Sequence, residues 1–102
     1  MQTVGKHNYF VYIMTNFERT VLYTGVTNDL LKRIAEHQQN NSVNKAFTSR
    51  YNIHFLVYWE HFTEIEDAIC REKEIKGWSR EKKNNLISDF NTDWKFLNDE
   101  IY

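Results

Sequence analysis

Clusters of aromatic and β-branched residues predict three β-strands in this chain of 102 residues. The first two clusters, Tyr9–Met14 and Val21–Val26, are separated by the six residues TNFERT, a spacing typical of a β-hairpin. The third strand is expected at Ile53–Trp59, which is rich in Ile, Phe, Val, Tyr and Trp.

Helix-capping residues predict where three helices begin and end. The expected helices, with their caps, run from about Asp29 to Gln39 after Thr27, Asn28 or Asp29, from a Thr63/Glu66 capping box to about Lys76 with Gly77 at its end, and from Ser79 to about Phe90. The predicted order is β-β-α-β-α-α. It indicates a small α+β fold of the α/β sandwich kind, in which helices flank a three-stranded antiparallel sheet. We expect one domain over residues 1–102, with its core at about 9–97.

Composition excludes several classes of protein. The chain is 41% hydrophobic and contains no proline, which is typical of a folded globular protein. Its single cysteine, Cys70, excludes an internal disulfide and a cysteine zinc cluster. The apolar runs are too short for a membrane helix, and the N-terminus does not resemble a signal peptide, so we expect a cytoplasmic protein without membrane contact.

The net charge of −1 does not favour nonspecific binding to nucleic acid. Charge is uneven, however, because the segment from Arg71 to Lys83 holds six cations and three glutamates. This segment is either a basic surface patch or an ordinary solvated helix face.

Two tyrosines are expected to meet across the hairpin. If its turn is centred between Phe17 and Glu18, paired positions sum to 35 and Tyr12 lies directly opposite Tyr23. The pair is either a catalytic pair of hydroxyls or a stabilising aromatic contact.

Arg33 and His37 lie four residues apart on the first helix, beside the expected apolar stripe of Leu30, Leu31, Ile34 and Ala35. Both side chains are therefore expected at the boundary between core and solvent. An arginine can hold a phosphate and a histidine can transfer a proton near neutral pH, although an ordinary exposed pair fits the spacing equally.

Glu72 is expected within the apolar stripe of the second helix, seven residues after Ile65 and together with Ala68 and Ile69. Glu74 should instead be a surface charge. A glutamate in such a stripe is normally paired or bound to a metal. The alternatives for Glu72 are magnesium binding and a buried salt bridge with Arg33.

These positions resemble those of the GIY-YIG nuclease family. The two tripeptides of the family correspond to Phe10-Val11-Tyr12 and Tyr23-Thr24-Gly25, YTGVTNDLLKRIAEH resembles its glycine-then-helix segment, and AICREKEIKGW resembles the helix with the metal-binding glutamate. The resemblance covers about Tyr9 to Leu97 and is closest to small stand-alone bacterial members, which are similar to the nuclease domain of the excision-repair nuclease subunit. The first tripeptide keeps only its tyrosine, and Thr24 replaces the central isoleucine of the second.

The resemblance implies a metal-dependent endonuclease, with DNA as the expected substrate and repair or nucleic-acid processing as the expected context. It implies Tyr12 as general base, Tyr23 as an orienting group, Arg33 as the phosphate clamp, His37 in positioning a water or assisting proton transfer, and Glu72 as ligand of Mg²⁺ or Mn²⁺. Further contacts to nucleic acid are implied for Gly25, Asn28, Lys45, Thr48, Arg50 and Lys76.

The sequence leaves two alternatives open. The chain could be a weakly active or inactive nucleic-acid-binding module with the same fold, or a protein that serves as an interaction surface. A protein partner for targeting is expected because the chain is short. The sequence does not indicate the oligomeric state.

Overall fold

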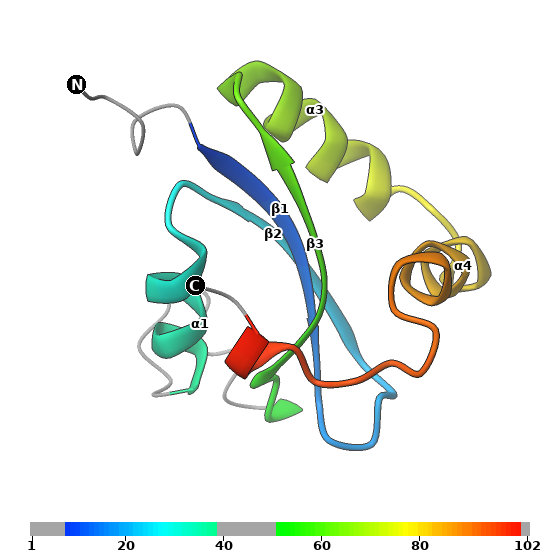
Figure 1. Cartoon of the computed structure of the whole chain (residues 1–102). Helices are drawn as coiled ribbons and strands as arrows, with labels where there is room; N and C mark the ends of the chain where they lie inside the picture. Colours follow the sequence, from blue (N-terminus) through cyan, green and yellow to red (C-terminus); the bar gives the residue numbers. More distant parts are fainter. Residues whose placement is uncertain (1–7, 39–50, 101–102) are drawn as a thin grey trace.

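Strand β1 (Tyr9–Thr15) is the centre of a three-stranded antiparallel sheet of order β2-β1-β3, in which β2 is Leu22–Thr27 and β3 is Phe55–Phe62. The computed structural model describes residues 8–38 and 51–100. Helix α1 (Leu30–Gln38) covers one face of the sheet, whereas α3 (Ile65–Lys76) and α4 (Arg80–Phe90) lie on the other side (Figure 1). A short 3₁₀ helix, η2 (Asn98–Glu100), follows. The predicted α+β fold and its element order are confirmed.

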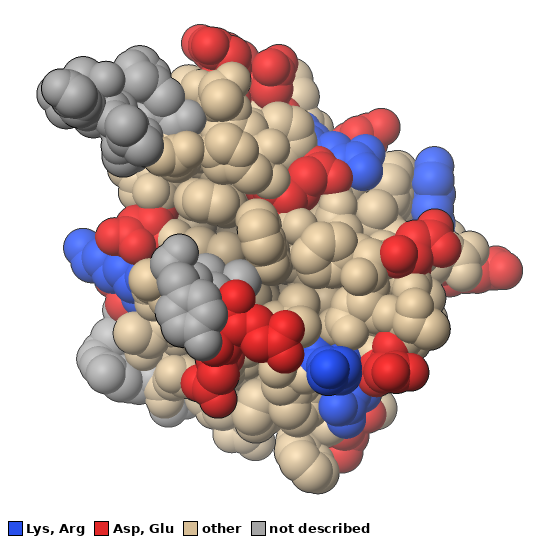
Figure 2. Space-filling model, viewed as in Figure 1, with Lys and Arg blue, Asp and Glu red and all other residues tan. Residues whose placement is uncertain are grey.

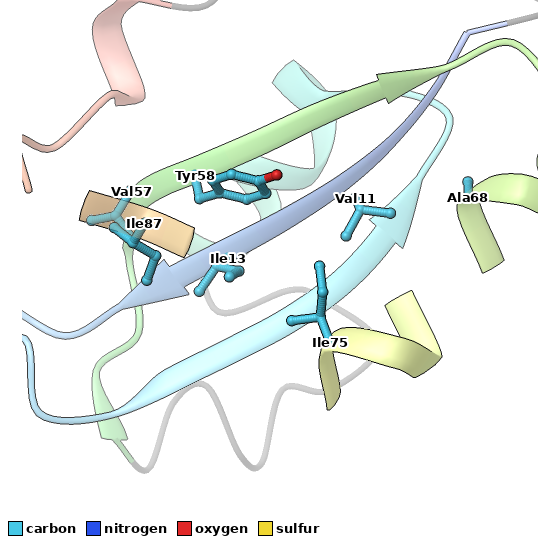
Figure 3. Close-up of a cluster of buried hydrophobic side chains, with 7 residues drawn as sticks. All are labelled: Val11, Ile13, Val57, Tyr58, Ala68, Ile75 and Ile87. Carbon is cyan, nitrogen blue, oxygen red and sulfur yellow. The ribbon is translucent and has the colours of Figure 1, made fainter. Parts of the chain in front are cut away.

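Two apolar layers hold the helices to the sheet. The layer toward α3 and α4 contains Val11, Ile13, Val57, Tyr58, Ala68, Ile75 and Ile87, which meet between the strands and the helices in Figure 3. The layer toward α1 contains Tyr12, Met14, Leu30, Ile34, Ile53, Leu56 and Leu97. Successive residues of a strand point to opposite faces, so Tyr12 points toward α1 while its neighbours Val11 and Ile13 point toward α3 and α4.

The hairpin register differs from the prediction by two residues. Tyr12 lies opposite Gly25, and Tyr23 lies opposite Met14. The cause is the loop, in which the Asn16 side-chain oxygen accepts the backbone N–H groups of Thr20 and Val21 at 2.9 and 3.0 Å. A shift of two residues keeps each side chain on its predicted face, so both tyrosines still point toward α1.

Strand β3 is longer than predicted at its C-terminal end. Its last pairs join Phe62 to Tyr9 and His61 to Phe10, although Glu60 and His61 end the apolar run in the sequence. The Glu60 carboxylate accepts hydrogen bonds from Tyr58 and Arg71, so a charged side chain is accommodated within the strand.

Two of the predicted helix caps are confirmed. The Asp29 carboxylate accepts the backbone N–H of Lys32 at 3.1 Å, and the Ser79 hydroxyl accepts that of Lys82 at 3.2 Å. The capping box of Thr63 and Glu66 is wrong, because α3 begins at Ile65 with Glu64 as a cap that makes no side-chain hydrogen bond.

Gly77 ends α3 as predicted, and its backbone N–H bonds the carbonyls of Lys73 and Glu74. Its φ of −83° is an ordinary right-handed helical value. The chain after α4 returns to the outer edge of β3, where Leu56 exchanges hydrogen bonds with the Leu97 N–H and the Asn98 side chain. Within the described residues, no helix is long and apolar enough to cross a membrane.

Candidate active site

Tyr12 occupies the middle of the central strand and has no exposed surface. Its ring lies directly against Gly25 on β2. A Cβ atom placed on Gly25 would come within 2.5 Å of the Tyr12 hydroxyl oxygen and 2.6 Å of Cζ. Glycine is therefore required at position 25 if the Tyr12 ring is to keep this place.

Tyr23 approaches Tyr12 diagonally rather than directly. The two ring centroids are 6.3 Å apart at an interplanar angle of 47°. Diagonal neighbours on one face of a sheet remain within reach of aromatic side chains. The predicted convergence of Tyr12 and Tyr23 is thus found, although the direct pairing that predicted it is wrong.

His37 reaches the same place from α1. Its Nε2 lies 3.2 Å from the Tyr12 hydroxyl oxygen, and its ring centroid is 5.3 Å from that of Tyr23. The sequence placed His37 at the solvent boundary, but the side chain has no exposed surface. The reason is the rotation of α1, which buries Leu30, Ile34 and His37 and leaves Leu31 48% exposed.

Burial controls the protonation of both members of this pair. It lowers the pKa of His37 to about 4, and the nearby Arg33 and His54 act in the same direction. It also raises the pKa of the Tyr12 phenol, as does Tyr23. At neutral pH the phenol therefore keeps its proton and the imidazole is neutral, and the tautomer of His37 sets which of the two donates the hydrogen bond between them.

Arg33 is the cation of this cluster. Its Nε lies 3.1 Å from the Glu36 carboxylate, and about a quarter of the side chain is exposed. Its positive charge lowers the pKa of Tyr12, as expected for a cation that favours phenolate, but burial outweighs this effect. The salt bridge considered between Arg33 and Glu72 is not formed, because each has a different partner.

Glu72 lies largely buried on α3, as predicted. Its side chain is 13% exposed, whereas that of Glu74 is 55% exposed. Its carboxylate pairs with the Lys76 ammonium one turn later. The predicted stripe is only partly correct, because Ile65 is 44% exposed and the fully buried residues of α3 are Ala68 and Ile75.

The site therefore has two parts. Tyr12, Tyr23, Gly25 and His37 form one cluster on the α1 side, while Glu72 belongs to α3. A pocket of about 270 Å³ beside Arg33 is lined by Tyr9, Val26, Thr27, Asn28, Arg33, Ile65 and Ile69, and by no residue of either part. Glu72 follows Ile69 by three residues, so it lies one helical turn beyond this lining.

A metal at this site would depend on few protein ligands. In the described part of the chain, no three His, Cys, Asp or Glu side chains are grouped to hold an ion. One carboxylate, that of Glu72, suits a magnesium ion that keeps several waters and takes further oxygens from a phosphate.

Of the remaining residues predicted to contact nucleic acid, some lie within the described part of the chain and others do not. Asn28 lines the pocket, and Lys76 is engaged with Glu72. Lys45, Thr48 and Arg50 lie outside the described residues. His54 was not predicted, yet its Nδ1 lies 2.9 Å from the backbone oxygen of His37. No sequence pattern indicates this contact, because the two histidines are 17 residues apart.

The cations between Arg71 and Lys83, either a basic patch or a solvated helix face by sequence, are interrupted by acidic partners. Arg71 pairs with Glu60 and Glu74, and Lys82 lies over the ring of Trp78. Figure 2 shows basic and acidic side chains interspersed on the face that it draws. Several cations of the segment from Arg71 to Lys83 are therefore engaged in contacts within the protein.

Known proteins match the part of the chain that contains these residues. Residues 8–85 match the family model described as the GIY-YIG catalytic domain. The chain is 40% identical over 86 residues to a UPF0213 protein of Staphylococcus saprophyticus, covering 84% of this chain and 99% of that protein. It is 37% identical to a UPF0213 protein of Natronomonas pharaonis, covering 80% of this chain and 93% of that one. The solution NMR structure of a UPF0213 protein of Bacillus halodurans has a TM-score of 0.51 and 33% identity, covering 79% of this chain and 83% of that one.

Proposed function

Because this chain belongs to the GIY-YIG family, we propose that it is a metal-dependent endonuclease that hydrolyses phosphodiester bonds, with DNA as the expected substrate. The observation that carries the proposal is the buried hydrogen bond between Tyr12 and His37 beside Tyr23. A phenol that is protonated at neutral pH cannot act as a base unless its own proton has an acceptor. In this proposal, Nε2 of the neutral His37 imidazole, 3.2 Å from the Tyr12 hydroxyl oxygen, is that acceptor.

In the proposed reaction, Tyr12 takes a proton from the attacking water as its own proton passes to Nε2 of His37. Tyr23 orients the nucleophile or the phosphate. Arg33 neutralises the charge that develops on the phosphoryl oxygens. Gly25 contributes by leaving space for the Tyr12 ring, in addition to the contact with nucleic acid that the family resemblance implies.

Glu72 would hold the divalent cation, Mg²⁺ or Mn²⁺, by exchanging Lys76 for it. Such an ion stabilises the charge on the phosphate and on the leaving oxygen. Lys76, which is 53% exposed, would then be available to contact a phosphate. Asn28, Lys45, Thr48 and Arg50 are proposed as further contacts to the strand.

The decisive experiment compares two glutamates on one helix. Purified wild-type protein and the variants Glu72→Ala and Glu74→Ala are incubated with single-stranded, duplex and branched DNA and with RNA, in Mg²⁺ or Mn²⁺. We expect Glu72→Ala to lose cleavage and Glu74→Ala to keep it, because Glu74 is exposed and pairs with Arg71. Cleavage that persists in Glu72→Ala, with unchanged thermal unfolding, would assign the activity to another site or to a contaminant.

A second function is favoured by the ground-state geometry. Tyr12 is fully buried and Glu72 is neutralised by Lys76, which also suits a nucleic-acid-binding module without useful turnover. Binding that weakens with salt, together with an absence of metal-dependent products from every substrate, would establish this alternative.

A further inference from the structure

The pocket between α1 and α3 combines an apolar wall with one cation. Ile65 and Ile69 come from α3, and Tyr9 and Val26 come from β1 and β2. Among the described residues that line it, Arg33 is the charged one and none is acidic, since Glu36, the salt-bridge partner of Arg33, lies outside the lining. The pocket therefore suits a ligand that carries a flat apolar group next to an anion.

Ile65 shows that the apolar wall is available to a ligand. It is the first residue of α3 and is 44% exposed, although α3 packs on the sheet through Ala68 and Ile75. Covering such a side chain with a ligand ring would remove apolar surface from water without repacking the core.

A second cavity provides a contrast. The space of about 380 Å³ at the β3 edge is lined by Trp59 and Phe90 but also by Asp93 and Glu100, with Lys95 as its cation. Two carboxylates would repel a phosphate, so this larger cavity suits nucleic acid less well than the pocket beside Arg33.

We propose that the pocket lined by Tyr9, Val26, Asn28, Arg33, Ile65 and Ile69 receives one unstacked nucleobase of the strand whose phosphate Arg33 contacts. The proposal rests on the proposed function and specifies its substrate class. The ring of Tyr9 and the isoleucines would cover the base, and the Asn28 amide can donate to and accept from its edge.

A pocket that receives one unstacked base restricts which nucleic acids can be substrates. A base inside a duplex is stacked on both faces and paired along its edge, so it must leave the helix before it can enter a pocket. The preferred substrates are therefore single strands and structures with an unpaired nucleotide, such as flaps and bubbles, rather than continuous duplex.

The test measures what a single base adds to binding. A fluorescent sugar-phosphate strand of about ten abasic units is compared with the same strand carrying one central thymine, by anisotropy in EDTA at low salt. We expect the thymine to tighten binding to wild-type protein about fivefold or more. The variant Ile65→Ala/Ile69→Ala should lose most of this gain while binding the abasic strand as before, because the walls are removed but Arg33 remains.

Two further variants complete the design. Leu31→Ala removes another exposed apolar side chain, on α1 and outside the pocket, and should keep the full gain from thymine. Ile65→Ala alone, at an exposed position, should lose part of the gain and covers the case in which the double variant unfolds.

The outcomes separate this proposal from the proposed function. Equal binding of both strands by wild-type protein, or a gain from thymine that survives in the double variant, would overturn the base pocket while leaving the nuclease proposal intact. Failure of the wild-type protein to bind either strand in EDTA would also overturn the base pocket, whereas the nuclease proposal is decided separately by the cleavage assay in Mg²⁺ or Mn²⁺.

Discussion

The ring of Tyr12 lies so close to Gly25 that a single added methyl group at position 25 would overlap the phenol hydroxyl. The two residues face each other on neighbouring strands, and Nε2 of His37 lies 3.2 Å from the same Tyr12 hydroxyl oxygen. The position of the proposed general base thus depends on the absence of a side chain on β2.

The variant Gly25→Ala should lose both stability and activity. Its Cβ would lie 2.5 Å from the Tyr12 hydroxyl oxygen, so the buried ring would have to shift. Overpacking of this kind costs about 1–3 kcal/mol. Urea denaturation should show that loss of stability. Cleavage should also fall under conditions where the variant is still folded, because the contact between Tyr12 and His37 is disturbed.

Gly77→Ala is the matched control for this substitution. The nearest atom to its added Cβ would be 3.6 Å away, and its φ of −83° suits alanine. We expect its free energy of unfolding to stay within about 0.5 kcal/mol of the wild-type value. A Gly25→Ala protein as stable as Gly77→Ala would contradict the packing described for Tyr12.

His37 should make stability depend on pH. Burial lowers its pKa from the usual 6.5 to about 4, so the unfolded chain binds a proton that the folded protein does not. The contribution of the neutral, buried His37 to the free energy of unfolding is complete above about pH 6.5 and is lost as the pH falls toward 4. The loss between pH 7 and pH 5 should be about 2 kcal/mol by urea denaturation.

His37→Gln isolates this contribution, since the amide keeps a hydrogen-bonding group near Tyr12 but does not titrate. The difference in unfolding free energy between wild type and variant should change with pH over that interval. A constant difference would mean that His37 titrates alike in the folded and unfolded chains.

Local chemistry in the sequence was sufficient for most of the fold. Asp29, Ser79 and Gly77 begin or end helices as predicted, because these caps depend on neighbouring residues, although the equally local capping box of Thr63 and Glu66 is wrong. The hairpin register required the side chain of Asn16 and the left-handed backbone of Arg19, with φ of 62°, which no hydrophobic pattern encodes.

The sequence predicts which faces carry the site residues, but not how deeply His37 is buried or where the pocket lies. Strand alternation placed Tyr12 and Tyr23 on one face, and helix spacing placed Glu72 in a partly buried stripe. The burial of His37 was missed because spacing gives the relative direction of two side chains and not the rotation of the helix against the sheet. The pocket beside Arg33 was also missed, since it forms only where α1, α3 and the end of β2 meet.

The pair of Lys76 and Glu72 should compete with metal binding. Removing the ammonium in Lys76→Gln leaves the Glu72 carboxylate without its partner at a largely buried position. We expect Mn²⁺ to bind about fivefold more tightly, since a partly buried ion pair is worth on the order of 1 kcal/mol. Isothermal titration calorimetry measures this change without any turnover.

Lys73→Gln makes the same change of charge at an exposed position of α3 and should leave Mn²⁺ affinity nearly unchanged. If Lys76 also contacts phosphate, Lys76→Gln should bind metal more tightly yet cleave more slowly. Weaker Mn²⁺ binding in Lys76→Gln would show that the Lys76 ammonium does not compete with the metal for the Glu72 carboxylate.

Arg80 should stabilise the hairpin loop from the start of α4. Its guanidinium donates to the backbone oxygens of Thr20 at 2.8 Å and Arg19 at 3.0 Å, so it fixes the loop whose conformation sets the register of β1 and β2. Arg80→Ala should lower the free energy of unfolding by about 1–2 kcal/mol, as expected for exposed hydrogen bonds from a charged donor. It should also increase amide hydrogen exchange in the loop. Arg80→Lys tests whether geometry or charge is responsible. A lysine ammonium lacks the planar fork that reaches both carbonyls, so the variant should resemble Arg80→Ala. Full stability in Arg80→Lys would instead show that a positive charge near the loop is sufficient.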